Sequence, residues 1–236
     1  MAAERLRLSS ILPLAWMGFC RGPWRCIGLT AVALSSATGL GLLAAELQAS
    51  TNPWMRHGGD ALWLMSFATP LLPLLALLRL ADNLLSGTTA DTPLKAERPL
   101  FWLLRQSLAL VVMETLILLG GATTIRGIFN LLIKHSGVLA ALSATIGSGI
   151  LLTWALSQLL ALPLMIHHGH QPLAAMEHSR NLTRHNLVKV LALAGLLVGL
   201  NLLGLMGACL GLLLTLPLSA LILMASCRTQ TPWRRD

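Results

Sequence analysis

Pro172-Leu-Ala-Ala-Met-Glu-His-Ser-Arg-Asn-Leu-Thr-Arg-His-Asn186 is the stretch of sequence that decides the fold. Ala175, Ser179, Leu182 and Asn186 recur at spacings of four, three and four residues, which places them on one face of an α-helix. The remaining surface of that helix is polar and basic. The pattern is typical of a short amphipathic helix that lies on a membrane surface.

The sequence on both sides of this segment is apolar. Between Leu187 and Cys227 only Lys189 is charged. We therefore interpret Pro163 to Arg228 as the exit of one membrane helix, the amphipathic helix on the surface, and a helical hairpin back through the bilayer.

The composition extends this interpretation to the whole chain. The chain has 236 residues, of which 55% are hydrophobic and 11% charged, whereas a soluble domain carries about 25% charged residues. Its apolar runs are continuous rather than alternating, which excludes a β-barrel. The sequence predicts an all-α fold, a polytopic transmembrane helical bundle.

We expect one integral membrane domain over residues 1–236, with six spans and short interfacial helices. The four arginines before the first apolar run argue against a cleaved signal peptide, so the first span is expected to be an uncleaved anchor. Pro70 and Pro73 are expected to kink the second span. The predicted spans are about 26–45, 61–80, 107–122, 142–166, 187–203 and 208–227, the interfacial helices 11–24, 99–106 and 172–186, and the polar linker 82–98.

The distribution of basic residues predicts the topology. All Lys and Arg residues except Arg56, Arg126 and Lys134 fall on one side of the predicted spans, which leaves 14 of the 17 on that side. Cytoplasmic loops carry the excess of Lys and Arg, so we expect both termini in the cytoplasm.

The net charge of +8 raises the question of a partner. A basic soluble protein would suggest nucleic acid, but here no basic run is interleaved with aromatic residues. The basic residues are better explained as orienting the helices and meeting anionic lipid. We therefore expect membrane lipids as partners, and no nucleic acid.

Glu114 lies within the third predicted span. A carboxyl group in hydrocarbon is costly and suggests proton or cation handling. The alternative is a structural glutamate that is hydrogen-bonded to a polar neighbour, for which Thr153, with Ser157 one turn further on, is the candidate.

Two pairs of glycines and one asparagine in the last predicted hairpin suggest contacts between helices. Gly195 and Gly199, like Gly207 and Gly211, are spaced four residues apart, which allows close approach of helix backbones. We expect packing of the last hairpin within the monomer, with a homodimer as the alternative. Asn201 is expected to form a hydrogen bond within the bundle.

The sequence contains no recognisable metal, cofactor or catalytic motif. His167, His168 and His170 cluster at the end of the fourth predicted span, but no Cys or carboxylate stands at ligand spacing, so solvated histidines are favoured over a metal site. The four cysteines show no CxxC spacing. Without a Ser-His-Asp set, a Walker motif or HExxH, we expect neither an enzyme nor a cofactor.

Several positions resemble a known bacterial group. The group contains uncharacterised six-helix inner-membrane proteins and the membrane domain of some glycerophosphoryl diester phosphodiesterases, and Cys227 stands where it often carries a tyrosine. The resemblance implies a six-helix fold in a bacterial inner membrane, and it implies no phosphodiesterase activity because that chemistry belongs to a separate soluble domain. It is carried by Trp16-Met-Gly-Phe19, Pro23, Ala175, Ser179, Leu182, Asn186, Gly204, Gly207, Gly211, Pro217 and Arg228.

Two functions follow as hypotheses. The first is a non-enzymatic membrane protein that organises lipid or the envelope, in which Arg180 and Arg184, one helical turn apart, hold anionic headgroups. The alternative is a small-molecule or ion transporter that uses Glu114, the kinked second span and Asn201.

Overall fold

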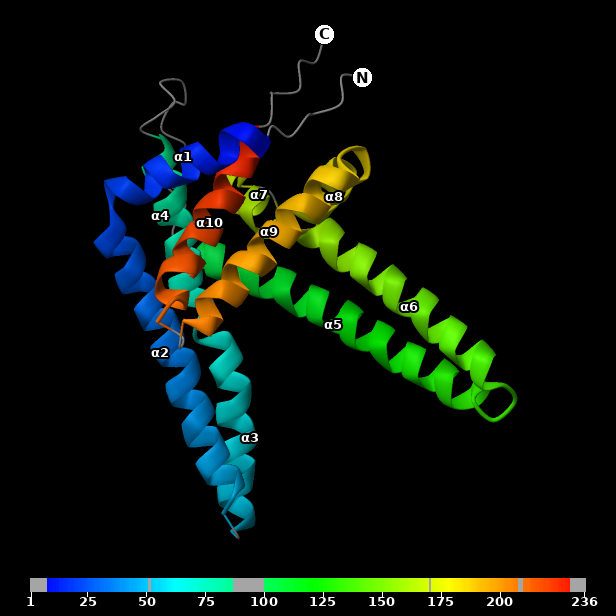
Figure 1. Cartoon of the computed structure of the whole chain (residues 1–236). Helices are drawn as coiled ribbons and strands as arrows, with labels where there is room; N and C mark the ends of the chain where they lie inside the picture. The colour runs from blue at the N-terminus through cyan, green and yellow to red at the C-terminus, as the bar shows by residue number, and fades with distance from the viewer. Residues whose placement is uncertain (1–7, 51, 87–99, 170, 208–209, 230–236) are drawn as a thin grey trace. The chain divides into compact units, whose positions relative to one another are not determined.

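The computed structural model describes residues 8–50, 52–86, 100–169, 171–207 and 210–229, and these residues are all-helical, without a strand (Figure 1). This confirms the predicted all-α class. Most of the predicted linker 82–98, His170 and the last residues of the chain lie outside the described residues. The helices are α1 (Leu8–Arg21), α2 (Pro23–Gln48), α3 (Pro53–Ala68), α4 (Leu71–Ser86), α5 (Leu100–Leu132), α6 (Gly137–Gln158), α7 (Ala161–His168), α8 (Pro172–His185), α9 (Leu187–Met206) and α10 (Leu212–Arg228).

Four helical segments are long and apolar enough to cross a membrane, as judged by length and composition. They are Pro23–Gln48, Phe101–Leu132, Gly137–His168 and Leu187–Met206. They correspond to the first, third, fourth and fifth predicted spans. The helix α10 is apolar but has 17 residues, which gives about 26 Å against a hydrocarbon layer of about 30 Å.

The second predicted span is broken rather than kinked. The Thr69 N–H still bonds to the Met65 carbonyl at 2.9 Å, but Pro70 and Pro73 have no N–H for the next helical bonds. The chain therefore ends α3 at Ala68 and restarts α4 at Leu71. Neither piece alone reaches the length of a span.

A proline also marks the end of the fourth predicted span. The helix α6 ends at Gln158, and α7 begins at Ala161, so that Pro163 is its third residue, as Pro73 is in α4. Leu-Pro-Leu stands at 12–14, 72–74, 162–164 and 216–218, within α1, α4, α7 and α10. The recurrence is a feature of the sequence that our predictions did not include.

The helix α5 differs from the predicted boundaries. Instead of an interfacial helix over 99–106 and a span over 107–122, residues Leu100–Leu132 form one continuous helix of 33 residues. Gly121 does not end the helix, because its missing side chain makes room for Leu151, whose Cδ2 would lie 2.5 Å from a Cβ there. A glycine that suggests a helix end in the sequence serves close packing in the structure.

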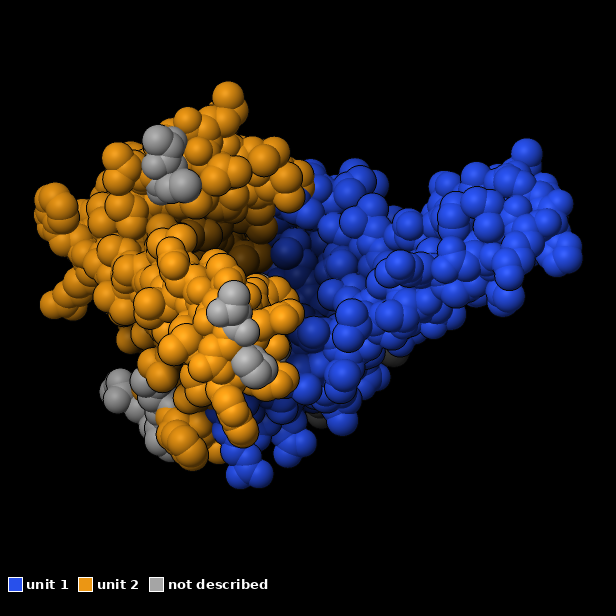
Figure 2. All heavy atoms as spheres, turned by 90° about the horizontal axis from the view of Figure 1, so that it is seen from below, with its two compact units in different colours: residues 1–5, 105–194, 232–236 blue, residues 6–104, 195–231 orange. Residues whose placement is uncertain are grey.

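The chain divides into two compact units, coloured in Figure 2. Apart from the chain ends, one unit is residues 105–194 and the other is residues 6–104 and 195–231. In the second unit α1 packs against α4 and α10, and α2 packs against α3, α4 and α10. Gly18 of α1 faces Leu85 and Leu221 together, since a Cβ there would lie 3.0 and 3.1 Å from their methyl groups.

The helices α2 and α3 form a tight hairpin in the same unit. Gln48 Nε2 donates a hydrogen bond to Asp60 Oδ1 at 3.0 Å. At Gly59 a Cβ would lie 2.9 Å from the Gln48 backbone nitrogen and 3.0 Å from the Ala44 oxygen. The glycine is needed because two backbones meet at this point.

The helices α9 and α10 cross closely through small residues. At Gly211 a Cβ would lie 2.5 Å from the Gly204 oxygen and 2.7 Å from its Cα, and Gly207 lies beside the same turn. At Gly195 and Gly199 a Cβ would meet no described atom within 4 Å. Of the two predicted glycine pairs, Gly207 and Gly211 therefore lie at this contact, and the other pair lies away from it.

We predict that Gly211→Ala destabilises the protein by about 1–3 kcal/mol, because the added methyl group meets rigid backbone atoms. The matched change Gly199→Ala adds a methyl group in open space on the same hairpin and should be neutral or stabilising by about 0.5–1 kcal/mol. The free energy of unfolding in a detergent titration measures both. Equal effects of the two substitutions would contradict the close crossing.

Candidate functional site

The predicted stripe of α8 is buried. The exposed fractions of Ala175, Ser179, Leu182 and Asn186 are 0%, 0%, 3% and 7%. The Ser179 hydroxyl donates a hydrogen bond of 2.6 Å to the Ser157 carbonyl at the end of α6. The stripe fixes α8 on the end of the α6–α7 segment through both apolar and polar contacts.

The opposite face of α8 presents the two arginines of the lipid hypothesis. Arg180 and Arg184 are exposed, and in the described part of the chain neither guanidinium makes a hydrogen bond or an ion pair. Met176, on the buried side, belongs to a core cluster with Leu110 and Ala161. The helix is thus held by one face and leaves its basic face open.

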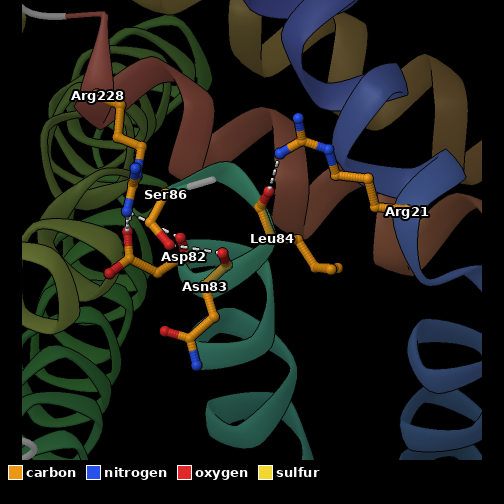
Figure 3. A network of polar contacts seen from close by, with 6 residues as sticks. All are labelled: Arg21, Asp82, Asn83, Leu84, Ser86 and Arg228. Atoms are coloured by element: carbon orange, nitrogen blue, oxygen red, sulfur yellow. Dashed lines mark hydrogen bonds and ion pairs between the residues drawn. The ribbon is translucent and has the colours of Figure 1, made fainter. Parts of the chain in front are cut away.

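Two other arginines are engaged in a polar network in the second unit (Figure 3). Arg228, at the end of α10, donates from Nε to Asp82 Oδ1 at 2.9 Å and from Nη2 to the Asp82 carbonyl at 2.8 Å. The ion pair between Nη2 and Oδ1 measures 2.7 Å, and the side chains are 9% and 22% exposed. This geometry joins the ends of α10 and α4.

Arg21, at the end of α1, completes the network. Its Nη1 donates to the Leu84 carbonyl at 2.9 Å, while the Ser86 hydroxyl donates to the Asn83 carbonyl at 2.6 Å. The last carbonyls of a helix have no partner within it and carry partial negative charge. The C-terminal end of α4 therefore receives a cation from each of two other helices.

The pairing of Asp82 with Arg228 was not predicted, because Asp82 was expected at the start of the polar linker. A signal for the pair existed. Asp82 follows the Leu-Pro-Leu of α4 at nearly the same interval as Arg228 follows that of α10. If these two tripeptides lie at similar depth, an acidic and a basic side chain meet at the same end.

Asn201 makes a hydrogen bond of the kind that we predicted for it. Its Nδ2 donates to Ser219 Oγ at 3.0 Å and to the Leu197 carbonyl at 2.8 Å. Ser219 in turn donates to the Thr215 carbonyl at 2.7 Å. Asn201 therefore connects α9 to α10.

Glu114 lies half-buried on α5, and its Oε1 is buried without a hydrogen-bond partner. The expected partner Thr153 donates its hydroxyl to the Gly149 carbonyl of its own helix at 2.8 Å. Ser157 likewise donates to the Trp154 carbonyl at 2.7 Å. Among the described residues, neither hydroxyl therefore forms the hydrogen bond to Glu114 that a structural role was expected to use.

The histidines near the end of α7 contact one another. The His167 and His168 rings lie 4.8 Å apart, and those of His168 and His178 lie 5.7 Å apart. In the described residues, which do not include His170, there is no group of three His, Cys, Asp or Glu side chains that could hold a metal ion. Cys20, Cys26 and Cys227 are free thiols.

Comparisons of the chain with known protein families, with curated proteins and with solved structures find no match.

We predict that Asp82→Asn lowers the free energy of unfolding by about 1–3 kcal/mol, because the largely buried Arg228 loses its charged acceptor. Glu46→Gln is the matched control, since Glu46 is exposed on α2 of the same unit, and it should change stability by less than about 0.5 kcal/mol. A double-mutant cycle with Arg228→Gln isolates the interaction energy. Additive effects in that cycle would show that the pair contributes nothing.

Proposed function

We propose that this chain is a non-enzymatic membrane protein that binds and organises anionic lipid at the cytoplasmic face of a bacterial inner membrane. The observation that carries the proposal is the contrast between two kinds of arginine. Arg21 and Arg228 make hydrogen bonds inside the fold, whereas Arg180 and Arg184 are exposed on a helix whose other face is buried.

The chemistry of the exposed pair suits phosphate groups. Guanidinium groups bind phosphate oxygens through several donors at once, and residues four apart on a helix lie one above the other. Exposed Glu177, on the same helix, keeps the surface from being purely basic. Within the described part of the chain these two arginines have no acceptor, so they are available for a phospholipid headgroup.

The proposed topology, with both termini in the cytoplasm, is supported in each unit separately. In the second unit Arg21 and Arg228 share one end of the helices, and Arg56 lies at the α2–α3 hairpin. In the first unit Arg180 and Arg184 lie on α8, and Lys134 lies in the turn between α5 and α6. Each unit has one strongly basic end, as the positive-inside rule requires of a cytoplasmic side.

Six crossings remain our proposal. The helices α2 and α3 pack as a hairpin, and α4 returns to α1 at the other end. We infer that α3 and α4 together make one crossing, broken at Pro70, and that α10 makes the last. This arrangement would agree with the six-helix family that the sequence resembles.

We predict that Arg180→Gln with Arg184→Gln weakens the binding of phosphatidylglycerol by about 30-fold, because each arginine near an anionic surface contributes about 1 kcal/mol. Native mass spectrometry of the purified protein, titrated with this lipid, measures the bound population. Arg126→Gln with Lys134→Gln is the matched control, because it removes the same charge from exposed positions elsewhere in the same unit. Equal lipid binding in the two double variants would refute the proposal.

We predict the topology through single cysteines in a cysteine-free background. His57→Cys and His135→Cys should react with a membrane-impermeant maleimide in intact cells. Asn83→Cys and Asn181→Cys should react only after the membrane is opened. All four positions are exposed, and none of the substitutions changes a Lys or Arg. The two ends of one unit are compared, His57 with Asn83 and His135 with Asn181. The same labelling at both ends of either unit would contradict an N-in, C-in arrangement.

A further inference from the structure

The helices α5 and α6 face each other in a defined antiparallel register. Gly121 faces Leu151, and Gly147 faces Ile125, since a Cβ at either glycine would lie within 2.7 Å of that side chain. Further along, Leu110 packs in one cluster with Ala161 and Leu162. The residue numbers add to 272 at both glycine contacts, and Leu110 with Leu162 of the same cluster gives the same total.

This register places Glu114 opposite Gln158. On α5, Leu110, Glu114 and Gly121 are separated by four and seven residues and lie on one helix face. On the partner segment Leu151, Trp154 and Gln158 are separated by three and four residues and also share one face. These are the two faces that the glycine contacts bring together.

Three polar atoms near this pair have no hydrogen-bond partner among the described residues. They are Glu114 Oε1, Gln158 Oε1 and Trp154 Nε1, and all three atoms are buried. The Gln158 side chain is well enclosed, because the residue is only 7% exposed and its Nε2 already donates to Ser157 Oγ at 3.3 Å. Buried polar groups without a protein partner normally bind a water molecule or a ligand.

The site lies beside the surface helix α8. Glu114 follows Arg105 by nine residues, which is about 13 Å along α5. Gln158 is the last residue of α6, next to Ser157, whose carbonyl accepts a hydrogen bond from Ser179 of α8.

The charged groups of the neighbouring elements lie elsewhere. The helix α6 carries no charged residue, and α7 carries His167 and His168 at its end. On α8, Glu177, Arg180 and Arg184 are exposed and His178 is half-buried. Along α5, Arg105 and Arg126 are the nearest charges.

We propose that the α5–α6 hairpin holds a hydroxyl group, from water or from a lipid, between Glu114, Trp154 and Gln158, and that this site takes up and releases a proton at Glu114. The Trp154 N–H donates a hydrogen bond to the oxygen of the hydroxyl group. The hydroxyl group in turn donates its own O–H to Glu114 or Gln158. Glu114 takes up a proton by relay: a carboxylate oxygen accepts the proton of this hydroxyl group while the hydroxyl oxygen accepts one from solvent water. Release runs in reverse, so one O–H bond forms for each O–H bond that breaks.

The donor set distinguishes this ligand from a metal ion. Two of the three atoms are oxygen acceptors, which would suit a cation, but the indole Nε1–H is a donor only. Its positive hydrogen would repel a metal cation held by the two oxygens. A hydroxyl group satisfies both kinds of partner. The inference does not depend on Arg180 and Arg184, so it stands or falls separately from the proposed lipid function.

Infrared difference spectroscopy of the whole protein in lipid nanodiscs tests the proposal. We expect a protonated-carboxyl band that appears reversibly as the pH is lowered and is absent in Glu114→Gln. The band should shift in Trp154→Phe and in Gln158→Met. The matched controls Thr115→Val and Thr153→Val remove neighbouring hydroxyls that bond to their own helices, and they should leave it in place.

Measurements on the wild-type protein distinguish a hydroxyl group of water from one of a lipid. A bound water gives an O–H stretching band that moves in heavy-oxygen water. A lipid hydroxyl instead makes the carboxyl band differ between phosphatidylglycerol, which has free hydroxyls, and phosphatidylserine, which lacks them. A carboxyl band of Glu114 that does not titrate, or that ignores the heavy-oxygen water, the lipid and both neighbouring substitutions, would overturn the proposal.

Discussion

The end of α4 is the point on which the second unit depends. The last carbonyls of any helix lack partners within it, and here the helix that they end packs against α1 and α10. Arg228 from α10 and Arg21 from α1 donate to the carbonyls of Asp82 and Leu84. The two arginines belong to the first and the last of the described helices. Because both donate to carbonyls near the end of α4, these two helices meet at that end.

The first unit applies the same principle with neutral groups. The helix α6 ends at Gln158, so its last carbonyls have no partner within the helix. Near the α6–α7 break, the Ser157 carbonyl receives the hydroxyl of Ser179 from α8. The surface helix is therefore held by a polar bond as well as by Met176 and its apolar neighbours. Since that face is occupied, the basic face is directed away from the core, which is the condition for meeting headgroups.

The sequence was sufficient for the features that depend on period and composition. Helix class, four of the apolar segments, and the buried stripe from Ala175 to Asn186 follow from spacing and hydropathy alone. It was insufficient where a residue has two possible uses. The third span was predicted to end at about residue 122, but Gly121 packs against Leu151 within a helix that continues to Leu132. Asp82 was placed in a linker because its partner, Arg228, stands 146 residues away, and the two positions are related only by their similar distance from a Leu-Pro-Leu tripeptide.

The α2–α3 hairpin has a consequence for biosynthesis. The helix α3 is too short and too polar near its start, with Arg56, His57 and Asp60, to enter a bilayer readily by itself. Its contacts are with the preceding helix, through Gln48 to Asp60 and through the close backbone approach at Gly59. If α2 and α3 cross the membrane as we propose, they would leave the translocon as one paired unit, because the apolar helix α2 supplies contacts that α3 lacks by itself.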